Sequence, residues 1–151
     1  MHAETCPKGA PAKYLAKVSG PLLDRLDIHI EVPQVDFKKL SDDSLAESSA
    51  EIKKRVNAAR KIQQQRLSGT GVSCNGKMTP AMTRKFCVID GQTKNMLEKS
   101  FEALGLSARA YDKILRVART IADLEGSENI TIDHVTEAVQ YRSLDRKFWR
   151  E

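Results

Sequence analysis

The sequence has few aromatic residues, few cysteines and no long apolar run, and each shortage excludes a class of protein. One Trp, three Tyr and four Phe are too few for a surface that stacks the bases of single-stranded nucleic acid. Cys6, Cys74 and Cys87 are odd in number and widely spaced, so we expect no disulfide framework and a reducing, cytoplasmic location. Without a signal peptide or an apolar run of transmembrane length, no membrane partner is expected.

Complete catalytic motifs are also missing. Residues 71–77, Gly-Val-Ser-Cys-Asn-Gly-Lys, fit the first part of a phosphate-binding loop, but Met78 stands where Ser or Thr must hold magnesium. No buried strand precedes it, and we interpret the match as coincidence. No metal site is predicted, because the Cys and His residues lack the paired spacing of zinc ligands: Cys6, Cys74, Cys87, His2, His29 and His134. We interpret His29 and His134 as surface residues.

What the chain does contain is enough length for a domain with a core, and an excess of positive charge. Its 151 residues include 25 Lys and Arg against 20 Asp and Glu, a formal net charge of +5. A single domain of this size can bury a proper hydrophobic core. This excess of positive charge is compatible with a nucleic-acid partner but does not require one.

The clearest predicted helix covers residues 108–125. Apolar residues recur at three- and four-residue steps and share one face. Ser107 is a predicted cap at the start, and Gly126 is suited to the left-handed turn at the end. The opposite face is polar, and we expect ion pairs there between Asp112 and Arg116, and between Arg119 and Asp123, each worth a few tenths of a kcal/mol.

Four further helices are predicted, which makes the chain mainly α, with a bundle of about five helices. They cover about residues 49–67, a stretch that follows Thr79 and Pro80, residues 93–104 after an Asp90–Gly91 turn, and a stretch after Thr131. The predicted core is Ile52, Val56, Phe86, Leu97, Phe101, Tyr111, Ile114, Leu115, Ala118, Ile121, Val135 and Val139. We expect the basic residues of the first helix to be solvated, with DNA contact as the alternative: Lys53, Lys54, Arg55, Arg60, Lys61 and Arg66.

One strand pattern precedes the helices. Ile28, Ile30 and Val32 alternate with polar residues, and Pro33 ends the pattern. A lone strand cannot satisfy its own backbone groups. It either pairs with a weak strand elsewhere in the chain or belongs to a sheet whose other strands this chain lacks, and we favour the second interpretation.

Two arginines are candidate functional residues. Arg109 lies in the first turn of the helix at residues 108–125, where the helix dipole disfavours a cation, so it is either a solvated surface arginine or a residue that meets an anion at the helix start. Arg25 is either the ion-pair partner of Asp24 or Asp27, or an arginine finger that stabilises transition-state charge on a phosphate bound elsewhere.

Long blocks of the sequence resemble the magnesium-chelatase-like AAA+ ATPases, most closely the competence-protein (ComM/YifB-type) branch. The first is Ser-Gly-Pro-Leu-Leu-Asp-Arg-Leu-Asp-Ile-His-Ile-Glu-Val-Pro at residues 19–33. The others are residues 47–60, 106–125 and 137–146, with Leu-Ser-Ala-Arg-Ala-Tyr-Asp-Lys-Ile-Leu at the start of the third. The resemblance extends over nearly the whole chain from about Tyr14.

The resemblance implies a domain organisation and roles for both arginines. Residues 1–40 would be a partly disordered remnant of the α/β nucleotide-binding domain, a helix and one strand, and residues 41–151 the C-terminal helical lid. Arg25 would be the arginine finger, acting on ATP held by a neighbouring subunit. Arg109 would be the sensor-2 arginine, which touches the phosphates of the bound nucleotide.

The resemblance also implies how the whole protein works. The full-length protein would bind ATP and Mg²⁺ in a ring, expected to be a hexamer, and couple ATP hydrolysis to DNA remodelling. This chain lacks Walker A, Walker B and sensor 1, so we expect a fragment with no ATPase activity that carries no bound nucleotide and binds added nucleotide weakly at best. The alternatives are a stand-alone basic helical module that binds DNA or protein, and a purely structural oligomerisation piece.

Overall fold

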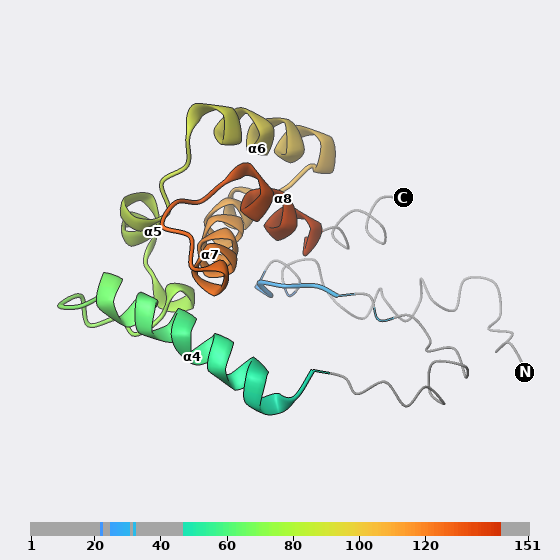
Figure 1. Cartoon of the computed structure of the whole chain (residues 1–151). Coiled ribbons are helices and arrows are strands. Elements are labelled where there is room, and N and C mark those ends of the chain that lie inside the picture. Colours follow the sequence, from blue (N-terminus) through green and yellow to red (C-terminus); the bar gives the residue numbers. More distant parts are fainter. Residues whose placement is uncertain (1–21, 23–24, 31, 33–46, 143–151) are drawn as a thin grey trace, which may run out of the picture.

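The structure is a computed structural model that describes Leu22, residues 25–30, Val32 and residues 47–142. Within these residues it contains α4 (Ser49–Arg66), a short 3-10 helix η1 (Asn75–Lys77), α5 (Pro80–Phe86), α6 (Gly91–Leu104), α7 (Ala108–Glu125) and α8 (Ile132–Gln140). Figure 1 shows them as a helical bundle. The predicted mainly-α fold with about five helices is therefore confirmed.

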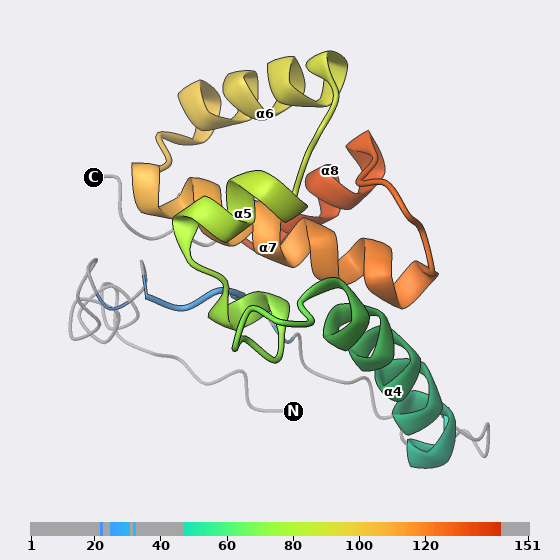
Figure 2. The same ribbon diagram turned by 90° about the vertical axis from the view of Figure 1, so that its left-hand side faces the viewer.

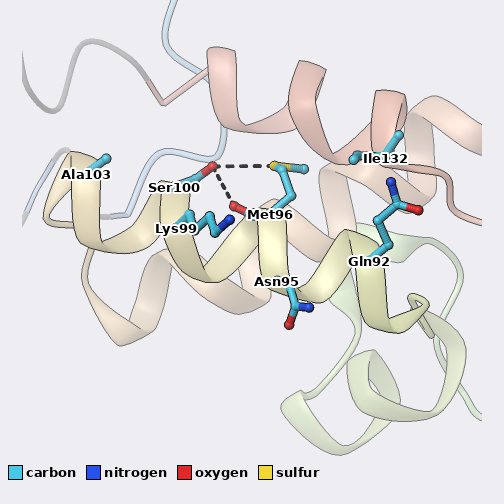
Figure 3. A pocket seen from close by; sticks show the side chains of 7 residues that line it. All are labelled: Gln92, Asn95, Met96, Lys99, Ser100, Ala103 and Ile132. Carbon is cyan, nitrogen blue, oxygen red and sulfur yellow. Dashed lines mark hydrogen bonds between the residues drawn. The ribbon is translucent and has the colours of Figure 1, made fainter.

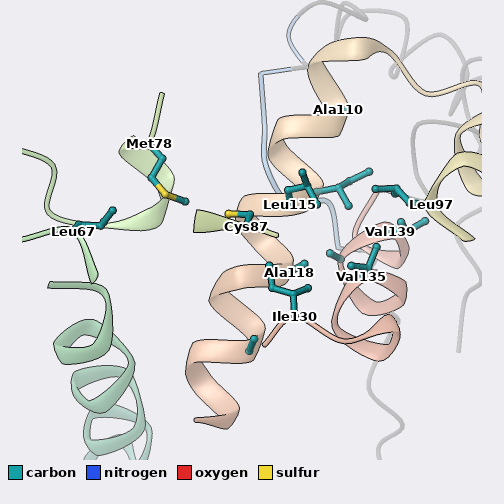
Figure 4. Close-up of a cluster of buried hydrophobic side chains, with 13 residues drawn as sticks. Leu67, Met78, Cys87, Leu97, Ala110, Leu115, Ala118, Ile130, Val135 and Val139 are labelled. Atoms are coloured by element: carbon teal, nitrogen blue, oxygen red, sulfur yellow. The ribbon is translucent and has the colours of Figure 1, made fainter. Parts of the chain in front are cut away.

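Helix α7 is the centre of the bundle, with both its apolar and its polar face covered. It packs against α4, η1, α5 and α8, and α6 packs against α8, an arrangement that can be followed in Figure 2. Close-packed apolar side chains fill the space between these helices (Figure 4): Leu67, Met78, Cys87, Leu97, Ala110, Ile114, Leu115, Ala118, Ala122, Ile130, Val135, Ala138 and Val139.

The helix ends follow the local chemistry of the chain. Ser48 and Glu51 form a capping box at the start of α4. Gly105 and Gly126 end α6 and α7 in the left-handed conformation, with φ of 59° and 78°. The predicted Asp90–Gly91 turn is wrong, because the Asp90 carboxylate accepts the Thr93 N–H at 2.7 Å and α6 begins directly after it.

The predicted core is partly wrong at α4. Ile52 and Val56 are 42% and 41% exposed, because the bundle meets only the second half of this helix, where Ala59 and Gln63 are buried. The first half of α4 extends away from the other helices (Figures 1 and 2). The other predicted core residues are buried or packed against the core: Phe86, Leu97, Phe101, Tyr111, Ile114, Leu115, Ala118, Ile121, Val135 and Val139.

The predicted strand is not formed in the described residues. Residues 28–30 and Val32 belong to no strand, and the His29 N–H instead donates to the Tyr141 carbonyl at the end of α8 (2.8 Å). The alternation is still visible, since Ile28, Ile30 and Val32 are exposed while His29 between them is buried. The boundary near residue 40 and most of the segment expected to be partly disordered lie outside the described residues.

Candidate functional site

Arg109 lies at an open helix start. It is exposed in the first turn of α7, where the Ser107 side chain makes no capping hydrogen bond and no acidic residue is present. The Ser107 hydroxyl is buried and has no hydrogen-bond partner among the described residues. Backbone N–H groups and the positive end of the helix dipole thus lie beside a guanidinium, an arrangement that favours an anion.

Lys113, one turn after Arg109, holds the segment that carries Arg25. Its ammonium donates to the Arg25 carbonyl oxygen and to the Asp27 carboxylate, the second at 2.6 Å. The Lys113 side chain is 13% exposed and that of Asp27 49%. The predicted pairing of Arg25 with Asp27 is therefore wrong, since Asp27 pairs with Lys113, whereas Asp24 lies outside the described residues. The Arg25 residue itself is exposed.

Two further contacts fix residues 25–30 against the bundle. The buried Arg142 donates through Nη1 to the Leu26 carbonyl oxygen, and the His29 N–H bonds to Tyr141 as described above. His29 is 7% exposed, so its interpretation as a surface residue is wrong. Figure 1 shows this segment in blue beside the helices. Three backbone groups and one side chain between Arg25 and His29 are thus hydrogen-bonded to α7 and to the end of α8.

A mostly apolar groove of about 340 Å³ lies between this segment and the bundle. It is lined by Asp27, Ile28, Ile30, Gly76, Arg116, Val117, Thr120, Ile121, Leu124, Glu137 and Tyr141. Arg116 enters it from α7 and donates to the Met78 carbonyl at 2.9 Å, a different partner from the predicted Asp112. The exposed Ile28 and Ile30 form one wall, so the apolar side of the predicted strand pattern is left uncovered in the described part of the chain.

A larger open hollow of about 770 Å³ runs along α6 and contains neither arginine. Its lining is Gln92, Asn95, Met96, Lys99, Ser100, Ala103 and Ile132 (Figure 3). The Ser100 hydroxyl donates to the Met96 carbonyl at 3.0 Å, and no histidine or carboxylate lines the hollow to activate it as a nucleophile. We find no catalytic arrangement there.

The polar face of α7 carries a buried charge cluster that contains the predicted ion pair of Arg119 and Asp123. The Asp123 carboxylate accepts from Arg119 Nε at 3.1 Å, from Arg66 Nη1 at 2.9 Å and from Asn75 Nδ2 at 2.8 Å. Arg119 also donates to the Ser127 and Glu128 carbonyls. Burial lowers the pKa of Arg119 and the neighbouring Asp123 opposes that shift; a guanidinium keeps its charge in either case.

Ion pairs with acidic residues reduce the number of basic residues on α4 that are available to a polyanion. Arg66 is occupied by Asp123, and Arg55 by Glu47 in an exposed ion pair. Four of the six basic residues are exposed and form no ion pair within the described part of the chain: Lys53, Lys54, Arg60 and Lys61. A smaller cationic patch therefore remains for a polyanion.

The partial phosphate-loop motif is part of the structural framework. Met78, at the position where magnesium binding would need Ser or Thr, is 2% exposed in the core. Asn75 is buried, its N–H donating to the Gln63 side chain at 3.1 Å. These contacts support the interpretation that residues 71–77 match the motif by coincidence.

The second histidine among the described residues is also structural. His134, interpreted from the sequence as a surface residue, is buried; its Nδ1 accepts the Thr131 N–H at 2.9 Å and its Nε2 contacts Glu125. Among the described residues, no group of three or more His, Cys, Asp or Glu could hold a metal ion. No helix in that part of the chain is long and apolar enough to cross a membrane.

Comparisons with known proteins extend along nearly the whole chain. Residues 46–142 match the family model "Magnesium chelatase, subunit ChlI C-terminal", and residues 1–40 match "Magnesium chelatase, subunit ChlI". The chain is 40% identical over 142 residues to the uncharacterized protein YifB of Salmonella typhimurium. It is 38% identical over 146 residues to competence protein ComM of Haemophilus influenzae. These alignments cover 93% and 96% of the chain but only 27% and 28% of the relatives.

Proposed function

This chain belongs to the magnesium chelatase ChlI family, and we propose that its helical lid works in an AAA+ ATPase that binds ATP and Mg²⁺. In this proposal Arg109 is the sensor-2 residue, which contacts the phosphates of the nucleotide, and Arg25 is the arginine finger that reaches ATP on the next subunit of a ring, expected to be a hexamer. The nucleotide state is read at the start of α7 and transmitted as a movement of the lid.

The observation that carries the proposal is the open start of α7 within the matched C-terminal region. Arg109 is exposed there beside uncapped backbone N–H groups, with no acid in the first turn. A carboxylate or a side-chain cap would compete with a phosphate, and the described residues place neither at this helix start. The arginine-finger role of Arg25 is supported by its placement, because Lys113 holds its backbone while the residue stays exposed.

A nucleotide titration of this chain followed by NMR tests the sensor role. We expect ATP to shift the backbone amides of residues 108–111, and Arg109→Ala to abolish those shifts. Arg84→Ala, which removes an exposed arginine from α5, is the matched control and should leave them unchanged. Shifts that persist in Arg109→Ala, or that are lost equally in Arg84→Ala, would contradict the assignment.

A chimera tests the finger role, because Arg25 would act between subunits. In it, this chain replaces the matched 142 residues of YifB. Both Arg25→Ala and Arg109→Ala should reduce ATP turnover strongly, since one transition-state arginine contributes about 10³–10⁵ in kcat in related phosphoryl transfers. Mixing Arg25→Ala subunits with subunits that cannot hydrolyse ATP but keep Arg25 should restore activity. No restoration would contradict action in trans.

The second candidate function is DNA binding, which the exposed patch of Lys53, Lys54, Arg60 and Lys61 on α4 favours. We propose that this patch contacts the DNA backbone, either within the ATPase or as a stand-alone module. Replacing the four residues by Gln should weaken duplex-DNA binding and lower its salt dependence, because each lost phosphate contact removes about one unit from the slope. Binding that is weak in the unmodified chain and insensitive to salt would exclude this function.

A further inference from the structure

We propose that Lys113 is a positioning residue that couples the start of α7 to the backbone of Arg25. In this inference, an anion bound at Arg109 changes the position of Arg25 through the contacts of one lysine ammonium. The inference rests on the proposed function, since it assigns the link between the two arginines on which that function depends.

The first step is the placement of Lys113 relative to Arg109. The two residues are four positions apart on α7, so they occupy the same face about 6 Å apart along the helix axis. Since the helix is a rigid element, a displacement of its first turn is felt one turn later. No flexible connection separates the anion-binding end from Lys113.

The second step is the way Lys113 is held. A lysine on a helix surface usually keeps its ammonium in water, but only 13% of this side chain is exposed. Two of its three N–H donors are committed, one to the Arg25 carbonyl oxygen and one to the Asp27 carboxylate. The ammonium therefore fixes the backbone of Arg25 itself and the side chain two residues later.

The third step is the support on the other side of the segment. Arg142 holds the Leu26 carbonyl, and the Tyr141 carbonyl holds the His29 N–H at 2.8 Å. These two contacts come from the end of α8, whereas Lys113 comes from α7. Residues 25–29 are thus attached to both helices, and among the hydrogen bonds of the described residues those from Lys113 come from α7, the helix that carries Arg109.

Coupling of this kind has a consequence for reaction geometry. A misplacement of about 1 Å in a catalytic group can cost about a hundredfold in rate. Small movements of α7, passed through Lys113, are therefore sufficient to bring Arg25 into or out of position. Loss of Lys113 should leave anion binding at Arg109 intact while Arg25 no longer responds to it.

The experiment titrates inorganic triphosphate against the chain and follows two sets of backbone amides by NMR. In the unmodified chain we expect shifts at residues 108–111 and also at residues 25–29. In Lys113→Met the first set should persist and the second should disappear, while Lys113→Arg, which can still donate to both acceptors, should restore the second set. Lys99→Met, on the exposed face of α6, is the matched control and should change neither set.

The outcomes separate this inference from the function on which it rests. Triphosphate shifts that are absent at residues 108–111 would overturn the sensor role of Arg109. Shifts at residues 108–111 without any at residues 25–29 in the unmodified chain would overturn the coupling alone. Shifts at residues 25–29 that survive in Lys113→Met would also overturn the coupling alone.

A measurement without ligand tests the contact itself. Amide hydrogen exchange at His29, whose N–H is hydrogen-bonded to the Tyr141 carbonyl, should become about tenfold faster in Lys113→Met, with the melting temperature and helical content unchanged. Asp27→Asn should give a smaller increase, because the bond from Lys113 to the Arg25 carbonyl is kept. Exchange at the His29 amide that is the same in Lys113→Met and in the unmodified chain would overturn the inference whatever the ligand does.

Discussion

Asp123→Asn is expected to destabilise this fold more than any other change of one carboxylate on α7. The Asp123 side chain is fully buried and is the counter-ion of two arginines, Arg119 and Arg66. The amide has nearly the same shape, so the substitution removes charge and one acceptor with little change in packing. What remains is two guanidinium groups without a compensating anion.

The expected magnitude follows from the burial of the partners. Removing one member of a buried ion pair typically costs about 3–5 kcal/mol, because the other charge is left unpaired. The Arg66 side chain is 18% exposed and can recover some hydration, whereas that of Arg119 is 4% exposed and cannot. The lower end, about 3 kcal/mol, is therefore expected. For a domain of roughly 100 residues, the size of the helical bundle at residues 47–142, it corresponds to a fall of roughly 12–24 °C in Tm.

The assay is urea unfolding followed by the helical circular dichroism signal. The midpoint should fall while the slope with denaturant stays the same, since the area exposed on unfolding does not change. Glu102→Gln, the same chemical change at an exposed position on α6, should alter stability by no more than about 0.5 kcal/mol. A loss below about 1 kcal/mol in Asp123→Asn would refute the reasoning that this carboxylate compensates both arginines.

Three further predictions concern packing, helix ends and a buried thiol. Leu67→Ala should lower the free energy of unfolding by about 2–5 kcal/mol and Ile52→Ala by less than about 1, because Leu67 is in the core and Ile52 is exposed; equal losses in urea unfolding would contradict this. Gly126→Ala should cost about 1 kcal/mol, since φ is +78°, whereas Gly91→Ala, at the start of α6 and without strain, should be neutral or stabilising by the same assay. Burial raises the pKa of the Cys87 thiol from 9.0 to about 11. Between pH 9 and 11 the thiol therefore stays protonated in the native state and loses its proton in the unfolded state. Its contribution to stability, about 3 kcal/mol for a shift of two pKa units, is complete below pH 9 and is lost as the pH rises through 11, and Cys87→Ala should remove that part of the pH dependence.

The helices themselves could be predicted, because their signals are local. The bounds of α7 agree with the sequence prediction since a six-residue apolar stripe and Gly126 define them without help from the rest of the chain. The capping box of Ser48 and Glu51 likewise sets the start of α4. Asp90 was misinterpreted because Asp-Gly is both a turn signal and a possible helix start, and only the geometry of the next turn distinguishes the two.

The candidate site was predicted only in part. Arg109 could be singled out because a cation in a first helical turn is locally unfavourable, and it is indeed exposed at an uncapped helix start. Lys113 carried no such signal: a lysine on the polar face of an amphipathic helix is ordinarily solvated. Its contacts are with residues 88 and 86 positions earlier in the chain, and no periodicity or spacing in the sequence predicts a contact of that kind.

The sequence by itself determined the family, the helical class and most helix ends, since these follow from matching residues in order and from interactions within a few positions. Tertiary structure alone decided which polar residues are buried. The sequence predicts only an ion pair between Arg119 and Asp123 on one helix. In the folded bundle, Arg66 of α4 and Asn75 of η1 also donate to the Asp123 carboxylate, and the pair is buried. The physical reason is that periodicity separates apolar from polar faces but does not say what covers each face. In α7 both are covered, so its polar side chains hold the bundle together.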